Sequence, residues 1–322
     1  MKSGMNHPKP YYPISRFFRN KFGQKVYKVS VSVAESCPNR QPNGKLNPCI
    51  FCDEWGSAAY HLEREQSLTE QIKINRERVQ KRCQAEQFLV YFQSYTNTFD
   101  RVDKLQSRFE TALQQKGIIG LVLGTRPDCL PQRIFPLLKS IQKQGYLMVE
   151  LGVQSFDDSQ LTYLQRGHNS QCSIKAIQQL HDLCGVDVGI HLIFGLPGES
   201  DESIIATAKQ VNALPVHNVK LHNLHVLKGT LLEQLYQQGQ FMPITLEEYA
   251  RRVALFLRHL SPDIAIQRLA AVANRWDELV APDWTKEKMR PIQYIEDLMN
   301  AQGIHQGDLT WSGKPGGGHS IR

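Results

Sequence analysis

The sequence predicts an α/β fold, a TIM-like partial (β/α)6 barrel with extensions at both ends. Three observations predict it. Short runs rich in β-branched and aromatic residues alternate with longer helical stretches, which is the order expected of parallel βα units. The runs are largely apolar, as strands covered on both faces are. The chain has 322 residues, of which 41% are hydrophobic, and this is enough for a core of that size.

Taken in order, six apolar runs predict six strands. They are KVYKVSVSVA (25–34), QFLVYFQ (87–93), IIGLVL (118–123), LMVELGV (147–153), VDVGIHLIF (186–194) and VKLHNLHVL (219–227). Helical stretches separate them at 64–83, 101–116, 131–144, 171–184 and 200–213. By analogy with complete barrels, the chemistry is expected at the carboxyl ends of these strands.

The remaining segments flank this barrel. The predicted domains are a basic aromatic arm (1–24), the barrel (25–230), a C-terminal extension packing on it (231–310) and a flexible glycine-rich tail (311–322). Within the extension we expect helices near 245–260 and 286–302, and an added strand from Ile264 to Arg268 that closes one side of the barrel.

Three cysteines follow the first predicted strand, in the segment CPNRQPNGKLNPCIFC. The N-terminus has no apolar stretch typical of a signal peptide, and no run approaches the ~20 apolar residues of a membrane span. We therefore expect a cytoplasmic protein, whose thiols stay reduced. Cys37, Cys49 and Cys52 then indicate a metal site. Three thiolates are one short of a closed zinc or iron–sulfur site, so a [4Fe–4S] cluster held by them leaves one iron open to a small molecule, against which Phe51 could pack.

A set of short stretches occurs in one order along the chain: CPNR, CIFC, YFQSYTNTF (91–99), GTRPDCLP (124–131), ELGVQS (150–155), RGH (166–168), HLIFGLPGE (191–199), QRL and APDW. Their resemblance is to radical S-adenosylmethionine (SAM) enzymes, most closely the YhcC/YtqA-like branch related to the radical SAM domain of the elongator catalytic subunit. It implies a barrel of the radical SAM type. It also implies a cluster whose open iron binds SAM. A further implied partner is an electron donor of the flavodoxin or ferredoxin type. Reductive cleavage of SAM to a 5′-deoxyadenosyl radical would then follow.

The resemblance also implies SAM contacts at the strand ends. Gln93, Ser94 and Tyr95 would face the amino end of SAM, although an ordinary polar turn is the alternative. Leu192 and Ile193 correspond to positions that border adenine, although either could be plain core.

The fourth strand and the arginine after it contact ribose and carboxylate in relatives, which implies roles for Gln154, Arg166 and Glu150. By alternation Glu150 and Gln154 share one face. A carboxylate such as Glu150 that faces a barrel interior also needs a partner.

Other polar residues on the last two strands have open roles. His191 could be a core histidine or a group facing substrate. Alternation places Lys220 and His222 together and His225 on the other side, so at most one set is expected to face the cavity.

Four further cysteines show no close ligand spacing, which argues against a second cluster. Cys83, Cys172 and Cys184 lie in helical patterns and are expected to be buried. Cys129 follows the third strand and has two alternative roles: it packs in the core or a loop, or its thiol faces the substrate.

The net charge of +7 is matched by the first 30 residues alone, which hold no acid and seven basic residues: Lys2, Lys9, Arg16, Arg19, Lys21, Lys25 and Lys28. Aromatic residues lie between them, a mixture suited to RNA phosphates and bases. The alternative is an arm that packs its aromatic residues on the barrel and leaves its lysines in water.

The elongator kinship and this arm suggest tRNA, specifically a wobble uridine, as substrate. No acetyltransferase domain fits in the chain, and Ala270 to Ala273 replace the Gly-Asp pair expected after QRL. Two alternatives are a radical SAM enzyme acting on a small metabolite, and a zinc-dependent RNA-binding module with His61 as fourth ligand. The oligomeric state stays open.

Overall fold

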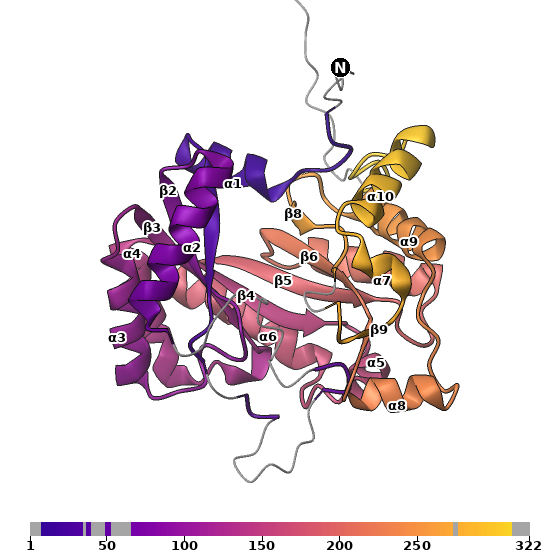
Figure 1. The fold of residues 1–322 in the computed structure, drawn as a ribbon, viewed down its shortest axis with the longest axis horizontal. Coiled ribbons are helices and arrows are strands. Elements are labelled where there is room, and N and C mark those ends of the chain that lie inside the picture. The colour runs from indigo at the N-terminus through magenta and orange to yellow at the C-terminus, as the bar shows by residue number, and fades with distance from the viewer. Residues whose placement is uncertain (1–7, 35–36, 40–48, 53–65, 273–275, 311–322) are drawn as a thin grey trace, which may run out of the picture.

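The computed structural model describes residues 8–34, 37–39, 49–52, 66–272 and 276–310. Within them a parallel seven-stranded sheet has the order β1-β2-β3-β4-β5-β6-β8 (Figure 1). The strands are β1 (Val26–Val31), β2 (Gln87–Phe92), β3 (Ile118–Thr125), β4 (Tyr146–Gln154), β5 (Asp187–Phe194), β6 (Asn218–Asn223) and β8 (Ala265–Arg268). This is the partial barrel that the sequence predicted, extended by the added strand.

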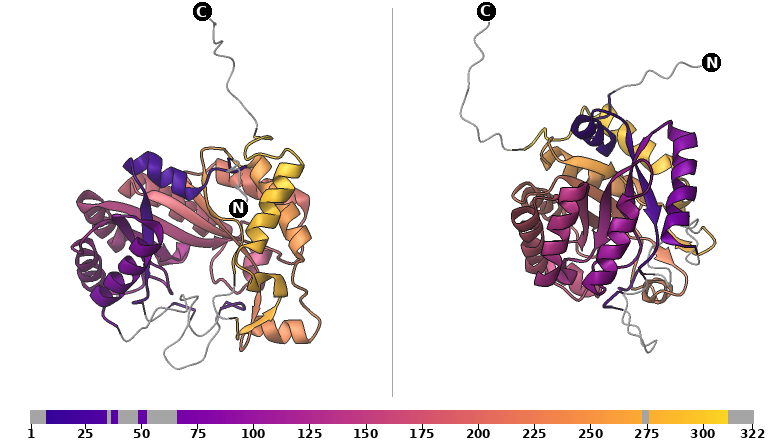
Figure 2. Two further views of the ribbon diagram at one scale, coloured as in Figure 1. Left: turned by 45° about the horizontal axis from the view of Figure 1, so that its top comes forward. Right: turned by 90° about the vertical axis from the view of Figure 1, so that its left-hand side faces the viewer.

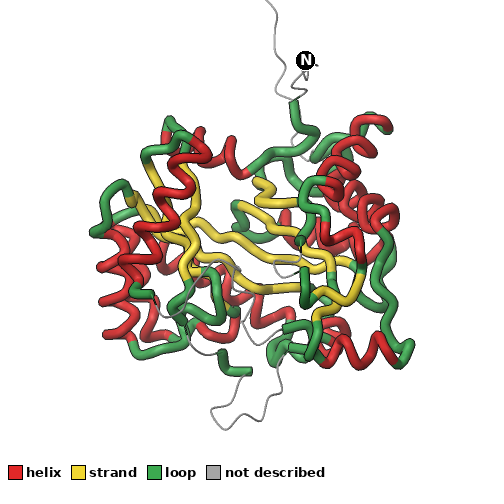
Figure 3. The backbone as a smooth tube through the Cα atoms, in the orientation of Figure 1, coloured by secondary structure: helices red, strands yellow, loops and turns green. Residues whose placement is uncertain are grey.

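The helices of the described residues lie mostly outside the strands (Figure 3), except that the first of them packs across one end of the sheet. They are α1 (Ile14–Phe22), α2 (Leu68–Cys83), α3 (Val102–Leu113), α4 (Phe135–Gln144), α5 (Asp158–Tyr163), α6 (Ser170–Gln179), α7 (Asp201–Asn212), α8 (Leu231–Gln237), α9 (Leu246–His259) and α10 (Arg290–Ala301). Side-chain caps fix where several begin. Ser67, for instance, starts α2 by accepting from the Glu70 backbone N–H while the Glu70 carboxylate accepts in return.

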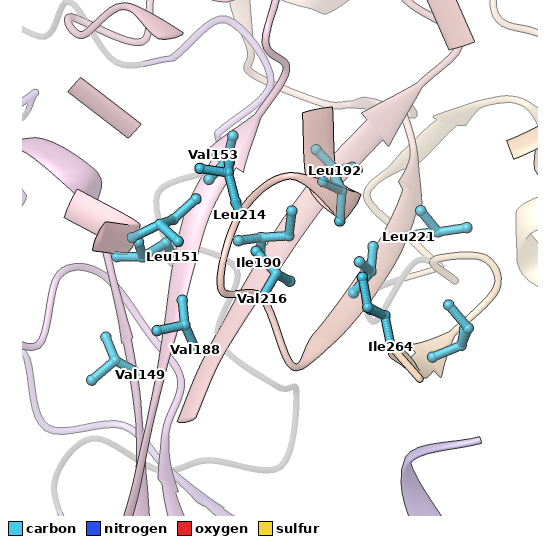
Figure 4. Packing of buried hydrophobic residues seen from close by; sticks show 14 of the residues in the cluster. Val149, Leu151, Val153, Val188, Ile190, Leu192, Leu214, Val216, Leu221 and Ile264 are labelled. Carbon is cyan, nitrogen blue, oxygen red and sulfur yellow. The ribbon is translucent and has the colours of Figure 1, made fainter. Parts of the chain in front are cut away.

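The main core lies between the sheet and these helices. Alternate residues of adjacent strands supply it, as Figure 4 shows for Val149, Leu151 and Val153 of β4 with Val188 and Ile190 of β5. All five are fully buried. Because side chains alternate along a strand, the residues between them face the barrel interior and are available to a site.

One predicted strand, 219–227, is wrong in its second half. Its pairing with β5 ends where Phe194 faces Asn223, because β5 itself ends there before Gly195, whose φ is +89°. The chain then turns, and β7 (Val226–Leu227) pairs antiparallel with β9 (Leu279–Ala281) instead.

The arm forms a helix that the sequence patterns did not predict. Pro13 precedes α1, and Gly23 ends it in the left-handed conformation with φ of 72°. Phe18 is buried against the first residues of the strands, including Val26 and Met148. Figure 2 shows α1 (indigo) crossing one end of the sheet. The packing alternative for the aromatic residues is therefore confirmed at Phe18.

The arm's charges are only partly available. Lys21 donates to Asp187 at 2.6 Å, and Lys9 pairs with Glu296. Lys28 points into the barrel and pairs with Glu150, so it cannot contact an RNA phosphate. Three others, Arg16, Arg19 and Lys25, are exposed, whereas Lys2 and the tail from residue 311 lie outside the described residues. No helix in the described part of the chain is long and apolar enough to span a membrane.

Candidate functional site

A cavity of about 230 Å³ lies among the carboxyl ends of the strands, the end at which barrel enzymes place their chemistry. Its walls include Gln93 after β2, Arg126 after β3, Gln154 at the end of β4, Ile193 in β5 and Asn223 at the end of β6. Since α1 packs at the amino ends of the strands, the arm and this cavity are at opposite ends of the barrel.

Backbone strain gathers at the cavity. In the described residues, four non-glycine residues have positive φ: Gln84, Tyr95, Gln154 and Gln165. Gln84 only caps α2. Tyr95 and Gln154 line the cavity, with φ of 59° and 70°, and Gln165 precedes Arg166, which also lines it. Strained backbone of this kind is retained where a site fixes its side chains.

The thiols of Cys37, Cys49 and Cys52 all line this one cavity. Ile50 anchors the segment that carries two of them, because its side chain is 1% exposed and its N–H donates to the Leu164 carbonyl at 3.2 Å. The N–H of Cys52 donates to the Cys49 carbonyl at 2.9 Å, which makes a tight turn. Thus the fold brings together cysteines that are separated by 11 residues at their widest gap.

Two buried arginines stand beside the thiols. Arg166 Nη1 donates to Cys49 Sγ at 3.1 Å, and Arg126 Nη1 lies 4.0 Å from Cys37 Sγ. Burial alone would lower the pKa of Arg126. However, its paired hydrogen bonds to Asp128, at 2.8 and 2.9 Å, outweigh burial and raise the pKa above its usual value. Arg126 thus remains charged, and the two guanidinium groups favour an anionic sulfur group next to them.

The donor set fits a thiolate-ligated iron–sulfur cluster. Arg166 Nε is buried without a hydrogen-bond partner among the described residues. It belongs to the guanidinium that contacts Cys49, so an unused donor lies next to the three cysteines. Within the same residues no three His, Cys, Asp or Glu side chains are close enough to hold one metal ion. A cluster places each cysteine on a separate iron. His61, the fourth ligand of the zinc alternative, lies outside the described residues.

Most of the residues predicted to contact SAM meet at the cavity. They are Phe51, Gln93, Tyr95, Glu150, Gln154, Arg166 and Ile193. Two others are elsewhere. Ser94 is buried outside the lining, and its hydroxyl finds no partner among the described residues. Leu192 belongs to the core between sheet and helices, since alternation sends it to the face opposite Ile193.

Glu150 has the partners that its burial demands. Its side chain is fully buried, and it pairs with Lys28, accepts from Gln267 at 3.0 Å, and lies 2.8 Å from His191 Nε2. Lys220 Nζ is 3.7 Å away. Burial would raise the Glu150 pKa, but the two lysines and His191 outweigh it and hold the pKa well below its ordinary value. Glu150 is therefore an ionised centre of a network beneath the cavity.

The expectation that only one set of β6 side chains faces the cavity is wrong. Lys220, His222 and His225 all line it. Alternation does not extend to His225, because the strand ends at Asn223 and Leu224 donates instead to the Phe194 carbonyl at 3.1 Å. The turn brings His225 back to the side of the other two.

Several lining residues were not predicted as site residues. Arg126 belongs to GTRPDCLP and Arg268 to QRL, two of the stretches that carried the resemblance, so the motifs held the signal. Tyr91 begins the stretch YFQSYTNTF but lies within an apolar strand, and it was not singled out. Ala271 and Val272, in the segment that departs from the family pattern, also line the cavity, whereas Ala273 lies outside the described residues.

The other cysteines are not in the lining of this cavity. Cys129 is buried, which raises its pKa to about 12, and this fits packing rather than reactivity. Cys184 is buried as expected, but Cys83, the last residue of α2, and Cys172, in the first turn of α6, are half-buried.

Comparison with known proteins decides the family. The profile of the Radical SAM superfamily matches residues 31–211, and that of the Radical_SAM C-terminal domain matches residues 216–301. The chain belongs to the radical SAM superfamily. It is thus a radical SAM enzyme, as its motifs predicted.

Two curated proteins match this chain over most of their length, and a third matches over about half of this chain. The chain is 35% identical over 294 residues to the uncharacterized protein MJ0486 of Methanocaldococcus jannaschii, covering 90% of this chain and 89% of that one. It is 34% identical over 285 residues to protein YhcC of Escherichia coli, covering 88% and 90%. It is also 34% identical over 165 residues to the tRNA uridine(34) acetyltransferase of Methanocaldococcus infernus, covering 50% of this chain and 29% of that protein.

A solved structure supports the fold. The archaeal Elp3 of Methanocaldococcus infernus, with an N-terminal deletion, superposes with a TM-score of 0.66 at 20% identity. The match covers 87% of this chain and 64% of that chain. The likeness shows that the two chains share a fold over the matched part.

Replacing Gln154 should separate SAM binding from the cysteine site. Gln154→Ala removes one polar group at the end of β4 without touching a cysteine, so SAM affinity should fall roughly tenfold, the worth of about one hydrogen bond, while iron content stays at the parental level. Equilibrium dialysis with SAM and an iron assay would measure both. Gln142→Ala, whose side chain serves the other end of β4, is the control. Unchanged SAM affinity in Gln154→Ala would contradict this placement.

Proposed function

We propose that Cys37, Cys49 and Cys52 hold a [4Fe–4S] cluster, and that the protein uses SAM to modify tRNA. The observation that carries the proposal is the meeting of three thiols with two arginines in one strand-end cavity. When bound, the cluster would supply one electron to cleave SAM reductively into methionine and a 5′-deoxyadenosyl radical. A protein electron donor of the flavodoxin or ferredoxin type would provide that electron.

The side chains around the cavity would bind and orient the cluster and SAM. Arg166 and Arg126 offset negative charge on the sulfur ligands, while Gln93, Tyr95 and Gln154 offer polar contacts to SAM. Apolar side chains help to exclude water from the reacting carbon; Phe51, Ile193, Leu224 and Leu227 line the same cavity. Holding a reactive species next to its target in this way is the protein's main contribution to rate.

The tRNA part of the proposal rests on relatives. Proteins named tRNA uridine(34) acetyltransferases share a segment that is half of this chain but 29% of the archaeal relative. That segment is too small a part of the relative to carry acetyl transfer across. What the proposal takes from the likeness is the substrate class, a uridine in tRNA.

A nucleoside profile would test this substrate directly. Total tRNA from cells with and without the gene should differ in one modified uridine, and the difference should vanish when the parent gene is restored but persist with Cys49→Ala. Identical profiles in all strains would refute tRNA as substrate and favour the small-metabolite alternative.

The exposed basic residues of the arm and of its junction with β1 give a further prediction. Reversing the charges of Arg16, Arg19 and Lys25 should weaken tRNA binding and make the slope of log affinity against log salt shallower by about one for each phosphate that the arm no longer binds. SAM cleavage without RNA should stay at the parental level, because the arm is at the far end of the barrel. Salt titrations of binding would measure the slope.

The control for the arm is the same charge reversal on the helical layer, at Lys73, Lys81 and Lys104, which are also exposed. If both triple variants lose the same affinity, net charge alone is responsible. If neither changes, the arm serves only the fold.

A further inference from the structure

Arg268 is a cation without an anion. It ends β8, at the opposite edge of the sheet from β1, and lines the cavity. Its Nη2 lies 2.6 Å from His222 Nδ1, and its Nε donates to the Leu221 carbonyl at 3.4 Å. In the described part of the chain no carboxylate pairs with it, and its Nη1 makes no hydrogen bond. Arg268 is half-buried, and a guanidinium held largely out of water usually has an anionic partner.

The neighbouring histidine does not provide that partner. Burial holds the pKa of His222 well below its ordinary value, with Arg268 and His191 adding to the effect. The neutral ring accepts from Arg268 and stacks against His191 at 5.2 Å, and His191 in turn is tied to Glu150. This chain of contacts orients the guanidinium but leaves its charge unmatched.

Two more buried groups on the same wall lack partners. Asn223 Oδ1 accepts from the Ala271 N–H at 2.9 Å, which fixes the amide so that its Nδ2 group is left without a partner among the described residues. His225 Nδ1 is likewise buried and unbonded within those residues. Both side chains line the cavity beside Arg268. Buried polar groups without partners are costly, so several on one wall indicate a ligand.

The charges of the surrounding network point the same way. Lys28 and Lys220 share one carboxylate, Glu150, which is saturated by them and by its hydrogen bonds. Because Lys28 pairs with Glu150 and burial lowers the pKa of Lys220 to about 7, the positive charge left unmatched on this side of the cavity is chiefly that of Arg268. An incoming anion would restore the balance.

We propose that Arg268, with Asn223 and His225, forms an oxyanion subsite that binds a carboxylate or phosphate group of the substrate. The inference rests on the proposed function, because it takes the substrate to be a uridine nucleotide in RNA. The Arg268 Nη1 group, which makes no hydrogen bond, and the unbonded Asn223 Nδ2 group can each donate to an oxygen of such a group. The subsite would hold the substrate on the wall formed by β6 and β8, away from the cysteine segment.

The test uses the reconstituted protein with SAM and no reductant. Calorimetry would measure binding of three probes: uridine, uridine 5′-monophosphate and 5-carboxymethyluridine. We expect at least one anionic probe to bind the parent roughly 10 to 100 times more tightly than uridine, as a charge-assisted contact allows. Arg268→Gln should reduce this preference to less than about twofold, and Arg268→Lys should keep part of it. The preferred probe tells whether the group is a carboxylate or a phosphate.

Arg258→Gln, which removes a half-buried arginine of α9 outside the cavity lining, is the matched control and should keep the full preference. SAM affinity should be the same in all four proteins. The proposal is overturned if the parent shows no preference for either anion or binds none of the probes. It is also overturned if Arg268→Gln keeps the preference, or if that variant loses SAM binding instead. Failure of the proposed function would appear separately, as absence of SAM cleavage when reductant is added.

Discussion

Cys49→Ala should lose the cluster and SAM cleavage together. The parent is expected to hold about four irons per chain after anaerobic reconstitution, because three cysteines at one cavity are the ligand set of an open [4Fe–4S] cluster. Removing the thiol takes away one ligand and leaves the Arg166 guanidinium without its sulfur contact at 3.1 Å. Iron analysis, the absorbance of the cluster and 5′-deoxyadenosine formation would all fall to background.

Cys184→Ala is the matched control. Cys184 is 7% exposed and Cys49 is 5% exposed, so both substitutions remove a buried thiol, but Cys184 packs at the helical layer. This control should keep its iron and its activity. Full iron occupancy in Cys49→Ala would show that the cysteine segment is not the cluster site.

Glu150→Gln should have the largest effect on stability. The carboxylate is fully buried, and its loss leaves the half-buried Lys28 without the anion that pairs with it, while Lys220, whose pKa burial already lowers to about 7, loses the charge that favours its protonated form. Breaking such a buried group costs about 3–5 kcal/mol of the free energy of unfolding. Denaturant titrations at neutral pH would measure it. Glu247→Gln, at an exposed position in the first turn of α9, should change stability by less than about 1 kcal/mol.

The pH dependence of this difference has a definite sign. Because the folded-state pKa of Glu150 lies well below its ordinary value of 4.5, its contribution is complete above that value. The contribution is lost as the pH falls through the folded-state pKa. The parent and Glu150→Gln should therefore converge in stability on acidification. A difference that stays constant down to about pH 2 would contradict the ionised state of Glu150.

The fold was predictable from the sequence because its strands are covered on both faces. Their apolar runs stand out, and their order alone predicts parallel pairing, so β1 to β5 were placed to within a few residues. What failed were short elements fixed by tertiary contacts. α1 is held in place because Phe18 packs at the amino ends of the strands. The sixth strand stops where its neighbour β5 stops, at Phe194.

The site was predictable in its chemistry but less so in its composition. The spacing of the cysteines predicts the ligand set, and position at a strand end predicts residues such as Gln93 and Gln154. Adjacent residues of a strand face opposite sides of the sheet, and two neighbouring apolar residues do not show which side each one faces. The sequence therefore could not tell that Ile193 faces the cavity and Leu192 the core. The grouping of Glu150 with Lys28, a residue 122 positions away, depends on how the sheet curls.

The most direct test of the central claim is reductive cleavage of SAM by the reconstituted protein. Anaerobic incubation with SAM and dithionite should yield 5′-deoxyadenosine and methionine in equal amounts, and neither product should form without reductant. Cys49→Ala, treated in the same way, should form neither. A parent protein that carries a full complement of about four irons, binds SAM and yet yields no 5′-deoxyadenosine above background would contradict the account.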